Sequence, residues 1–325
     1  MKVLITGIAG FIGFHTAQRL AARGDEVVGV DNLNDYYSVA LKRARLHLLG
    51  DSVSFVEADI ANSDAFISLV KSQKPEVIVT LAAQAGVRYS IENPFAYARS
   101  NLLGHLSVLE ACRQWEGLKH LVYASSSSVY GSNKKVPFAE EDRVDNPVSL
   151  YAATKRSDEL LSAAYAELYK IKQIGLRFFT VYGTWGRPDM AYWEFTKSIL
   201  EGQPIRVFNE GNMMRDFTHI DDIVSGIVAT ITSPVFTNGE SPHRLYNIGN
   251  NKPSRLMDFV NLIELYTGHT ANIVYVPMQP GDVVSTYANI DRMRADYQFE
   301  PTVSLTDGIR EFVDWYRRYS NHAVP

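Results

Sequence analysis

The sequence predicts an α/β protein with a doubly wound parallel sheet, on the basis of three observations. Short apolar runs rich in Val and Ile alternate with longer helical patterns through the first 180 residues. The runs lack the strict polar alternation of a strand with one face in water, and a glycine-rich turn follows the first run. We expect helices at His15–Ala22, Ala65–Ser72, Leu102–Trp115 and Ser157–Tyr169. We expect strands buried on both faces at Val3–Thr6, Glu26–Val30, Val53–Ala58, Val77–Leu81, His120–Ala124 and Gln173–Phe178.

Composition and charge exclude several functional classes. The net charge of −4 is dispersed, so we predict no partnership with nucleic acid or a membrane surface. No apolar run reaches the roughly 18 residues of a membrane span, and glycines interrupt the run after Met1, so we expect a cytoplasmic protein and no signal peptide. The single cysteine, Cys112, and the scattered histidines indicate no disulfide framework and no metal site.

A dinucleotide site is predicted at the turn after the first strand. Gly7, Gly10 and Gly13 would allow a tight turn, close approach of a pyrophosphate and close helix–strand packing. The spacing is G-x-x-G-x-x-G, which also suits an ordinary strand–helix turn. Asp31 ends the second strand, where a carboxylate would bind the adenosine ribose hydroxyls, although it could also serve as a turn or cap residue. Asn32 and its two followers include no Arg or Lys for a 2′-phosphate, so NAD is favoured over NADP.

The rhythm of the sequence changes after about Thr180. Loops rich in Gly, Pro, Asn and Asp then separate short elements, which indicates a smaller, interleaved α+β substrate domain. We expect residues 1–180 to form a Rossmann domain and residues 181–325 the substrate domain. The helical pattern Asp221–Thr232 and the strand-like Leu245–Ile248 suggest that about 216–250 returns to the first domain.

A catalytic pair is predicted at the start of the helical pattern after the fifth strand. Tyr151 and Lys155 lie four residues apart and therefore on one helix face. The usual tyrosine pKa of about 10 is too high for a base at neutral pH. A neighbouring ammonium and a positive nicotinamide ring favour the phenolate, which makes a tyrosine a general base. A plain amphipathic helix has the same spacing, so the position in a nucleotide-binding sheet is what favours the catalytic interpretation.

The fifth strand runs into four consecutive serines, Ser125 to Ser128, here called the serine row, and then into Val129-Tyr130-Gly131. Serine runs also occur in flexible linkers, but a buried strand leads directly into this one. The carboxyl end of a central strand is where such sheets bind ligands. We therefore expect these hydroxyl groups at the ligand site.

Together with Asp59-Ile60, Leu81-Ala82-Ala83 and Asn101, these motifs resemble the extended short-chain dehydrogenases/reductases along the whole chain. The resemblance implies that Tyr151 is the base, Lys155 its partner and Ser126 the hydroxyl that bonds the reacting sugar oxygen. It also implies a homodimer formed through a helix bundle that includes Leu102–Trp115, although those apolar residues would equally suit an internal core. The positions that match the NAD site of the family are Gly7, Gly10, Phe11, Ile12, Gly13, Asp31, Asn32, Asp59, Ile60, Leu81, Ala82, Ala83, Asn101, Ser125, Tyr151 and Lys155.

Within that family, the residues after Ser126 separate the reaction types. Nucleotide-sugar 4,6-dehydratases carry an Asp-Glu pair where this chain has Ser127 and Ser128. UDP-glucuronate decarboxylases typically carry Glu at the place of Ser128. Epimerases need no further acid or base, and non-catalytic NAD-sensing relatives usually lack the Tyr–Lys pair. The resemblance therefore predicts reversible C4 epimerisation of a UDP-sugar through a transient 4-keto intermediate.

The segment after the sixth strand resembles UDP-glucuronate 4-epimerases. Thr180 stands where UDP-galactose 4-epimerases have Asn, and those enzymes have no Arg matching Arg187. An Arg suits a sugar carboxylate because its hydrogen bonds are charge-assisted. A surface salt bridge is the alternative for Arg187, and Arg88 is a second candidate anion ligand. UDP-glucuronate and UDP-galacturonate are thus expected; neutral UDP-hexoses, UDP-N-acetylhexosamines and decarboxylation are the alternatives.

The resemblance also implies residues for the nucleotide part of the substrate. Arg215 matches the Arg that binds the diphosphate, and Asp282 matches the acid that meets the uridine ribose. Gln279 stands where galactose epimerases have Arg, so one phosphate contact is expected to be missing. The full set of expected substrate residues is Arg88, Ser127, Ser128, Thr180, Arg187, Val207, Asn209, Arg215 and Asp282, with Val207 and Asn209 beside the uracil.

Overall fold

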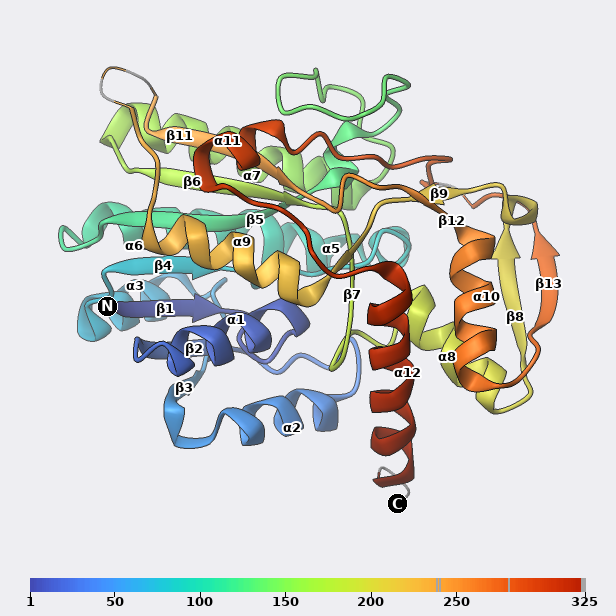
Figure 1. The fold of residues 1–325 in the computed structure, drawn as a ribbon. Helices are drawn as coiled ribbons and strands as arrows, with labels where there is room; N and C mark the ends of the chain where they lie inside the picture. The colour runs from blue at the N-terminus through green and yellow to red at the C-terminus, as the bar shows by residue number, and fades with distance from the viewer. Residues whose placement is uncertain (238, 240, 280, 323–325) are drawn as a thin grey trace.

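The computed structural model describes residues 1–237, 239, 241–279 and 281–322. Its centre is a parallel seven-stranded sheet in the order β11-β6-β5-β4-β1-β2-β3 (Figure 1). The predicted doubly wound α/β class is confirmed, and each predicted strand lies within two residues of its expected bounds. The strands of the sheet are β1 (Lys2–Thr6), β2 (Glu26–Asp31), β3 (Val53–Glu57), β4 (Val77–Thr80), β5 (His120–Ser126), β6 (Gln173–Phe178) and β11 (His243–Ile248).

One strand contradicts the expectation of burial on both faces. Ser54 and Phe55 of β3 are exposed, whereas β4 and β6 are buried throughout. Among the described strands, β3 pairs with β2 alone and forms one edge of the sheet. A strand at this position lies at the margin of the helix layers, so part of its surface stays in contact with water.

Helices cover both faces of the sheet. On one face, α1 (Phe11–Ala22) and α9 (Ile220–Thr232) contact each other and pack on the central strands. On the other face lie α3 (Ser63–Gln73), α6 (Gly104–Gln114) and α7 (Leu150–Tyr169). The helix expected at Leu102–Trp115 is divided, because a π-helical turn, η2 (Ala98–Leu103), precedes α6. No helix was expected at α2 (Val39–Leu49), where basic residues interrupt the apolar pattern.

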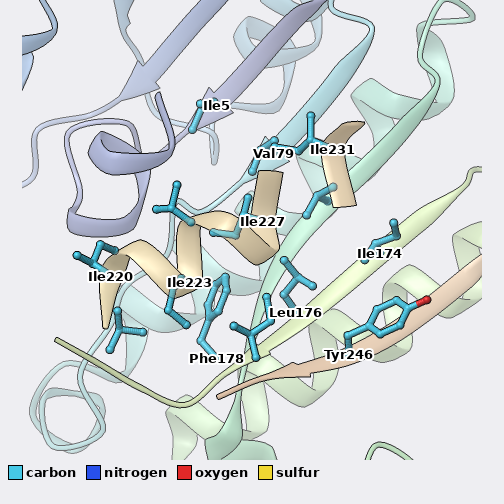
Figure 2. Packing of buried hydrophobic residues seen from close by; sticks show 14 of the residues in the cluster. Ile5, Val79, Ile174, Leu176, Phe178, Ile220, Ile223, Ile227, Ile231 and Tyr246 are labelled. Atoms are coloured by element: carbon cyan, nitrogen blue, oxygen red, sulfur yellow. The ribbon is translucent and has the colours of Figure 1, made fainter. Parts of the chain in front are cut away.

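The segment 216–250 contributes a helix and a strand to the sheet layer. β11 pairs with β6 in parallel, with Leu245 opposite Gly175, and so becomes the seventh strand. Three- and four-residue spacing brings the apolar side chains of α9 to one helix face. Figure 2 shows that face packed over the strands that contribute Ile5, Val79 and Leu176. The residues concerned on α9 are Ile220, Ile223, Ile227 and Ile231.

The remaining C-terminal elements form a second core beyond the carboxyl ends of the sheet strands (Figure 1). This core joins α8 (Ala191–Leu200), α10 (Leu256–Thr267) and α12 (Leu305–His322). Three two-stranded ladders accompany it: β7 (Thr180–Tyr182) with β10 (Phe217–His219), β8 (Pro204–Phe208) with β13 (Asn272–Val276), and β9 (Met214–Arg215) with β12 (Ser254–Arg255). Shorter elements are η1 (Gly50–Ser52), α4 (Tyr89–Glu92), α5 (Pro94–Tyr97), η3 (Ser127–Tyr130), η4 (Asn209–Gly211) and α11 (Asp291–Tyr297). Among the described residues, no helix combines the length and apolar character that a membrane crossing requires.

Candidate active site

A cavity of about 1160 Å³ opens between the carboxyl ends of the sheet strands and the C-terminal elements. Strand order reverses between β1 and β4, and open α/β sheets bind ligands at such a switch point. Pockets for one small ligand usually span roughly 300–1,000 Å³. This cavity exceeds that range, so it can hold more than one small ligand group.

The glycine turn between β1 and α1 forms one end of the cavity. A Cβ atom at Gly7, where φ is +73°, would lie 2.7 Å from the backbone nitrogen of Ala82. A Cβ at Gly13 would lie 2.1 Å from the carbonyl oxygen of Gly7. Gly10 precedes α1 and supplies no side-chain cap, so the first N–H groups of the helix remain available to an anion. The turn therefore fits a dinucleotide pyrophosphate.

Asp31 lies beside this turn at the end of β2. Its Oδ2 accepts a hydrogen bond from the Ala9 N–H at 3.1 Å, and its Oδ1 accepts one from the Leu33 N–H at 2.8 Å. Burial raises the pKa of Asp31, against the opposing effect of the Lys42 ammonium. A carboxylate fixed at this strand end fits a ribose diol.

Lys42 is a cavity residue that the sequence did not indicate. It comes from α2, and its Nζ donates to the backbone oxygen of Asn34 at 2.7 Å and to Oδ1 of Asn34 at 2.8 Å. Burial lowers the pKa of Lys42, although Asp31 opposes that shift. The three residues after Asp31 include no cation, so the local sequence does not indicate a positive charge at the cofactor end. The packing of α2 brings Lys42 there.

Tyr151 and Lys155 line the cavity from the first turns of α7. The helix begins there because Oγ of Ser149 accepts a hydrogen bond from the Ala152 N–H at 3.0 Å, which is an N-cap contact. Lys155 is buried, and its Nζ donates to Oδ2 of Asp158 at 2.8 Å. Burial lowers the pKa of Lys155, but the negative groups of Asp158 and Tyr151 more than offset this, so the net direction is upward. Lys155 therefore stays charged at neutral pH.

Two members of the serine row have different partners. Ser125 Oγ donates to Oε1 of Glu159 at 2.6 Å, and Glu159 is itself paired with the buried Arg177. Ser126 Oγ accepts from the N–H of Ser128 at 3.1 Å, which leaves the Ser126 hydroxyl proton available to a ligand oxygen. All four serines line the cavity, at the carboxyl end of β5 and in η3. Of the serine row, Ser126 is thus a suitable hydrogen-bond donor to a substrate.

Arg187 lines the opposite side of the cavity and is paired with Asp189 in a two-point contact. Nε donates to Oδ1 at 3.0 Å, and Nη2 donates to Oδ2 at 2.6 Å. The phenol of Tyr36 donates to the same Oδ2 at 3.0 Å. Burial lowers the pKa of Arg187, but the negative charge of Asp189 raises it by more. The net direction is upward, so the guanidinium remains charged. The contact is a partly exposed ion pair on the cavity wall, with side-chain exposures of 23% for Arg187 and 27% for Asp189. Both the salt-bridge interpretation and the ligand role of Arg187 agree with this geometry.

Arg88, Asp282 and Arg215 form a second group of charged residues that line the cavity. The guanidinium carbon of Arg88 lies 4.8 Å from the ring centre of Phe208, and an Nη2–Oδ2 distance of 3.9 Å joins Arg88 to Asp282. Arg215 donates to the backbone oxygens of Met214 and Val284. Burial lowers the pKa of Arg215, so an anionic ligand would stabilise this guanidinium.

Three of the predicted site residues do not reach the cavity. Val207 is fully buried in the second core; successive side chains of a strand point to opposite faces, and its neighbour Phe208 lines the cavity instead. The side-chain amide of Asn209 donates a hydrogen bond to the backbone oxygen of Asn212. Asn101 is buried in η2, where it binds the backbone of Gln84 and the hydroxyl of Thr154.

The cavity brings together the other predicted residues. Pro280, within the segment Gln279–Asp282, lies outside the described residues. Sequence reasoning missed Tyr36, Lys42 and Phe208, which no local motif marks, and it gave no role to Asp189, two residues after Arg187. The predicted residues that line the cavity are Gly7, Gly10, Phe11, Ile12, Gly13, Asp31, Asn32, Asp59, Ile60, Leu81, Ala82, Ala83, Arg88, Ser125, Ser126, Ser127, Ser128, Tyr151, Lys155, Thr180, Arg187, Arg215 and Asp282.

Known proteins resemble this chain over nearly its full length. "Protein CapI" from Staphylococcus aureus is 50% identical over 98% of this chain and 99% of its own, and a "Probable UDP-glucuronate 4-epimerase" from Rhizobium meliloti is 46% identical over 97% of both. The crystal structure of a UDP-glucuronic acid 4-epimerase from Bacillus cereus, in complex with UDP-glucuronic acid and NAD, superimposes with a TM-score of 0.91. It is 34% identical and covers 98% of this chain and 100% of its own. The profile of the NAD dependent epimerase/dehydratase family matches residues 3–249. On this match and these identities, the chain belongs to the NAD-dependent epimerase/dehydratase family, and its cavity contains both the glycine turn and the Tyr–Lys pair.

Proposed function

We propose that this protein catalyses the reversible C4 epimerisation of UDP-glucuronate to UDP-galacturonate. The observation that carries the proposal is the Arg187 guanidinium on the wall of the cavity that also contains Tyr151 and Ser126. A guanidinium in this position can bind a sugar carboxylate through charge-assisted hydrogen bonds. The named activity of the two epimerase relatives described above supports the same substrate.

The chemistry assigns one role to each of three side chains. Tyr151, as phenolate, removes the proton from the C4 hydroxyl, and the Lys155 ammonium stabilises that phenolate. Ser126 donates a hydrogen bond to the same oxygen. Bound NAD, held by the glycine turn and Asp31, supplies a hydride acceptor and then a hydride donor at C4. The 4-keto sugar turns over in the cavity, and Tyr151 returns the proton once C4 is reduced from its other face.

Holding the carboxylate has a chemical purpose as well. A 4-keto uronic acid is a β-keto acid, and it loses CO₂ when its carboxylate bond aligns with the carbonyl π system. Because Asp189 and Tyr36 fix Arg187, the guanidinium can hold the carboxylate away from that alignment. Ser127 and Ser128 provide hydroxyl groups at the two positions where the dehydratases carry their acid–base pair, which argues against dehydration.

The nucleotide part would lie toward the C-terminal elements. Arg215 is proposed to bind the diphosphate, because burial makes a compensating anion favourable there. Asp282 is proposed to accept from the uridine ribose. We further propose that residues 1–180, with about 216–250, bind the cofactor, and that the rest of 181–325 forms the substrate domain.

Incubation of the holoenzyme with UDP-glucuronate, followed by separation of the products, tests the proposal. UDP-galacturonate is the expected product. Release of CO₂ with a UDP-pentose would indicate a decarboxylase instead. Turnover of UDP-glucose or a UDP-N-acetylhexosamine without turnover of UDP-glucuronate would favour the neutral-sugar alternative and reject the role of Arg187.

A homodimer is proposed through the face that α4, α5, η2 and α7 share. These elements contact one another and expose several large apolar side chains. Isolated exposed apolar residues are ordinary, but a group of them suggests an interface. Light scattering should give about twice the monomer mass, and a monomer at assay concentration would contradict the proposal. The side chains concerned are Ile91, Phe95, Leu103, Leu160 and Leu168.

A further inference from the structure

We propose that Asp158 is a positioning residue that holds Lys155 and sets the charge acting on Tyr151. The inference rests on the roles proposed above for Tyr151 and Lys155. Lys155 and Asp158 are three residues apart on α7 and share a helix face. Nζ of Lys155 lies 2.8 Å from Oδ2 of Asp158, and both side chains are buried. Lys155 lines the cavity, whereas Asp158 stands behind it.

Each member of this pair depends on the other. Oδ1 of Asp158 is buried and has no hydrogen-bond partner in the described part of the chain. The acid that follows it, Glu159, binds Arg177 at 2.8 Å and Arg156 at 3.0 Å, so those two cations are already paired with another carboxylate. A buried ion left without its partner is strongly destabilising. Lys155 is therefore the counter-ion of Asp158, and Asp158 fixes the position of Lys155.

The neighbouring titratable groups leave this pairing intact. Burial lowers the pKa of His105, and Nε2 of this ring lies 2.8 Å from Oγ of Ser162, so the imidazole is neutral. Burial raises the pKa of Tyr123 well above its usual value, so this phenol is neutral too. The groups that face the pair are Tyr151 and Glu159 on α7, His105 on α6 and Tyr123 on β5.

Pairing changes what Lys155 does to Tyr151. An isolated buried ammonium would stabilise a neighbouring phenolate strongly, whereas an ammonium compensated by a carboxylate stabilises it less. Asp158 thus has two effects: it keeps Nζ in place, and its negative charge offsets part of the positive charge that acts on Tyr151.

The test is the pH profile of the Asp158→Asn holoenzyme. The carboxamide keeps the size of the side chain and an oxygen acceptor for Nζ, and it removes the negative charge. We expect the acid limb of kcat/KM to move to lower pH by about one unit. The matched control is Asp222→Asn, at a buried carboxylate of α9 that accepts from the N–H groups of Thr302 and Val303 away from the cavity. The control should leave the acid limb where it is.

An acid limb at the wild-type pH in Asp158→Asn would overturn the proposal. Asp158→Glu retains the charge and should keep the wild-type profile; a shift as large as that of Asp158→Asn would also overturn it. If Asp158→Asn does not fold, Asp158→Ser provides the same comparison. Phenolate absorbance in the near ultraviolet, taken as the difference from a Tyr151→Phe background, gives a second readout without substrate. It therefore tests Asp158 even if UDP-glucuronate is not the substrate.

Discussion

The two walls of the cavity are built in different ways. The cofactor wall takes its shape from backbone: Gly7 and Gly13 leave no room for a side chain, and Asp31 is fixed by two backbone N–H groups. The substrate wall takes its shape from charged side chains that hold one another, with Arg187 on Asp189 and Arg88 near Asp282.

Because of this difference, the two walls should respond differently to a substitution. A wall made of backbone accepts no added atom. In a wall made of ion pairs, a change of one side chain leaves the charge of its partner uncompensated. Arg45 joins the two walls: its guanidinium donates to the backbone oxygens of Ala9 on the cofactor side and of Trp185 and Gly186 on the substrate side.

The largest expected effect lies where the walls meet, at Tyr151. Tyr151→Phe removes the proton acceptor and leaves both walls in place, so turnover should fall by about 10²–10⁴-fold while NAD remains bound. Product formation and the absorbance of the bound cofactor measure the two quantities. Tyr169→Phe, a half-exposed tyrosine at the end of the same helix, is the matched control and should be fully active. Full turnover by Tyr151→Phe would reject its role as the base.

The addition of one methyl group to the cofactor wall should abolish most NAD binding. In Gly13→Ala the new methyl would sit 2.1 Å from the Gly7 oxygen, so the turn must move, at a cost of roughly 1–3 kcal/mol or more. We expect the purified protein to lose most of its bound NAD. Gly24→Ala is the control: its φ of +86° strains an alanine, but no atom lies within 4 Å, so the protein should lose some stability and keep its NAD. Retention of NAD by Gly13→Ala would show that the turn is not the cofactor site.

The same contrast explains what the sequence could predict. The glycine turn, Asp31 and the Tyr151–Lys155 pair follow strand–helix alternation, and local spacing is enough to find them. Lys42 reaches the cavity only through the packing of α2, and no local pattern marks it. Asp189 lies two residues after Arg187, but the spacing alone does not show that their side chains pair. The place of Val207 beside the uracil stays a prediction, but its side chain lies in the second core, because the position in β8 decides which face a side chain takes.

Arg187→Ala should affect the substrate wall selectively. Loss of a charge-assisted contact costs about 1.5–3 kcal/mol. That corresponds to roughly a 10- to 100-fold weaker binding of UDP-glucuronate, with NAD content unchanged. Asp189→Asn is the matched variant, because it keeps the guanidinium and removes its counter-charge, and it should bind UDP-glucuronate no more weakly than the wild type. Calorimetric titration with UDP-glucuronate and UDP-glucose distinguishes the cases, and an equal loss for both ligands would contradict carboxylate recognition by Arg187.

The smallest expected effect is at Arg88, the second candidate anion ligand. Its contact with Asp282 spans 3.9 Å and the Arg88 side chain is 54% exposed, so solvent screens the pair. Arg88→Gln should change the free energy of unfolding by no more than about 0.5 kcal/mol. We expect thermal melts within error of the wild type and only a several-fold change in the affinity for UDP-sugars, with no preference between UDP-glucuronate and UDP-glucose. A selective loss of UDP-glucuronate would instead make Arg88 the carboxylate ligand and leave Arg187 as its structural neighbour, because only the residue that meets the carboxylate can distinguish the two sugars.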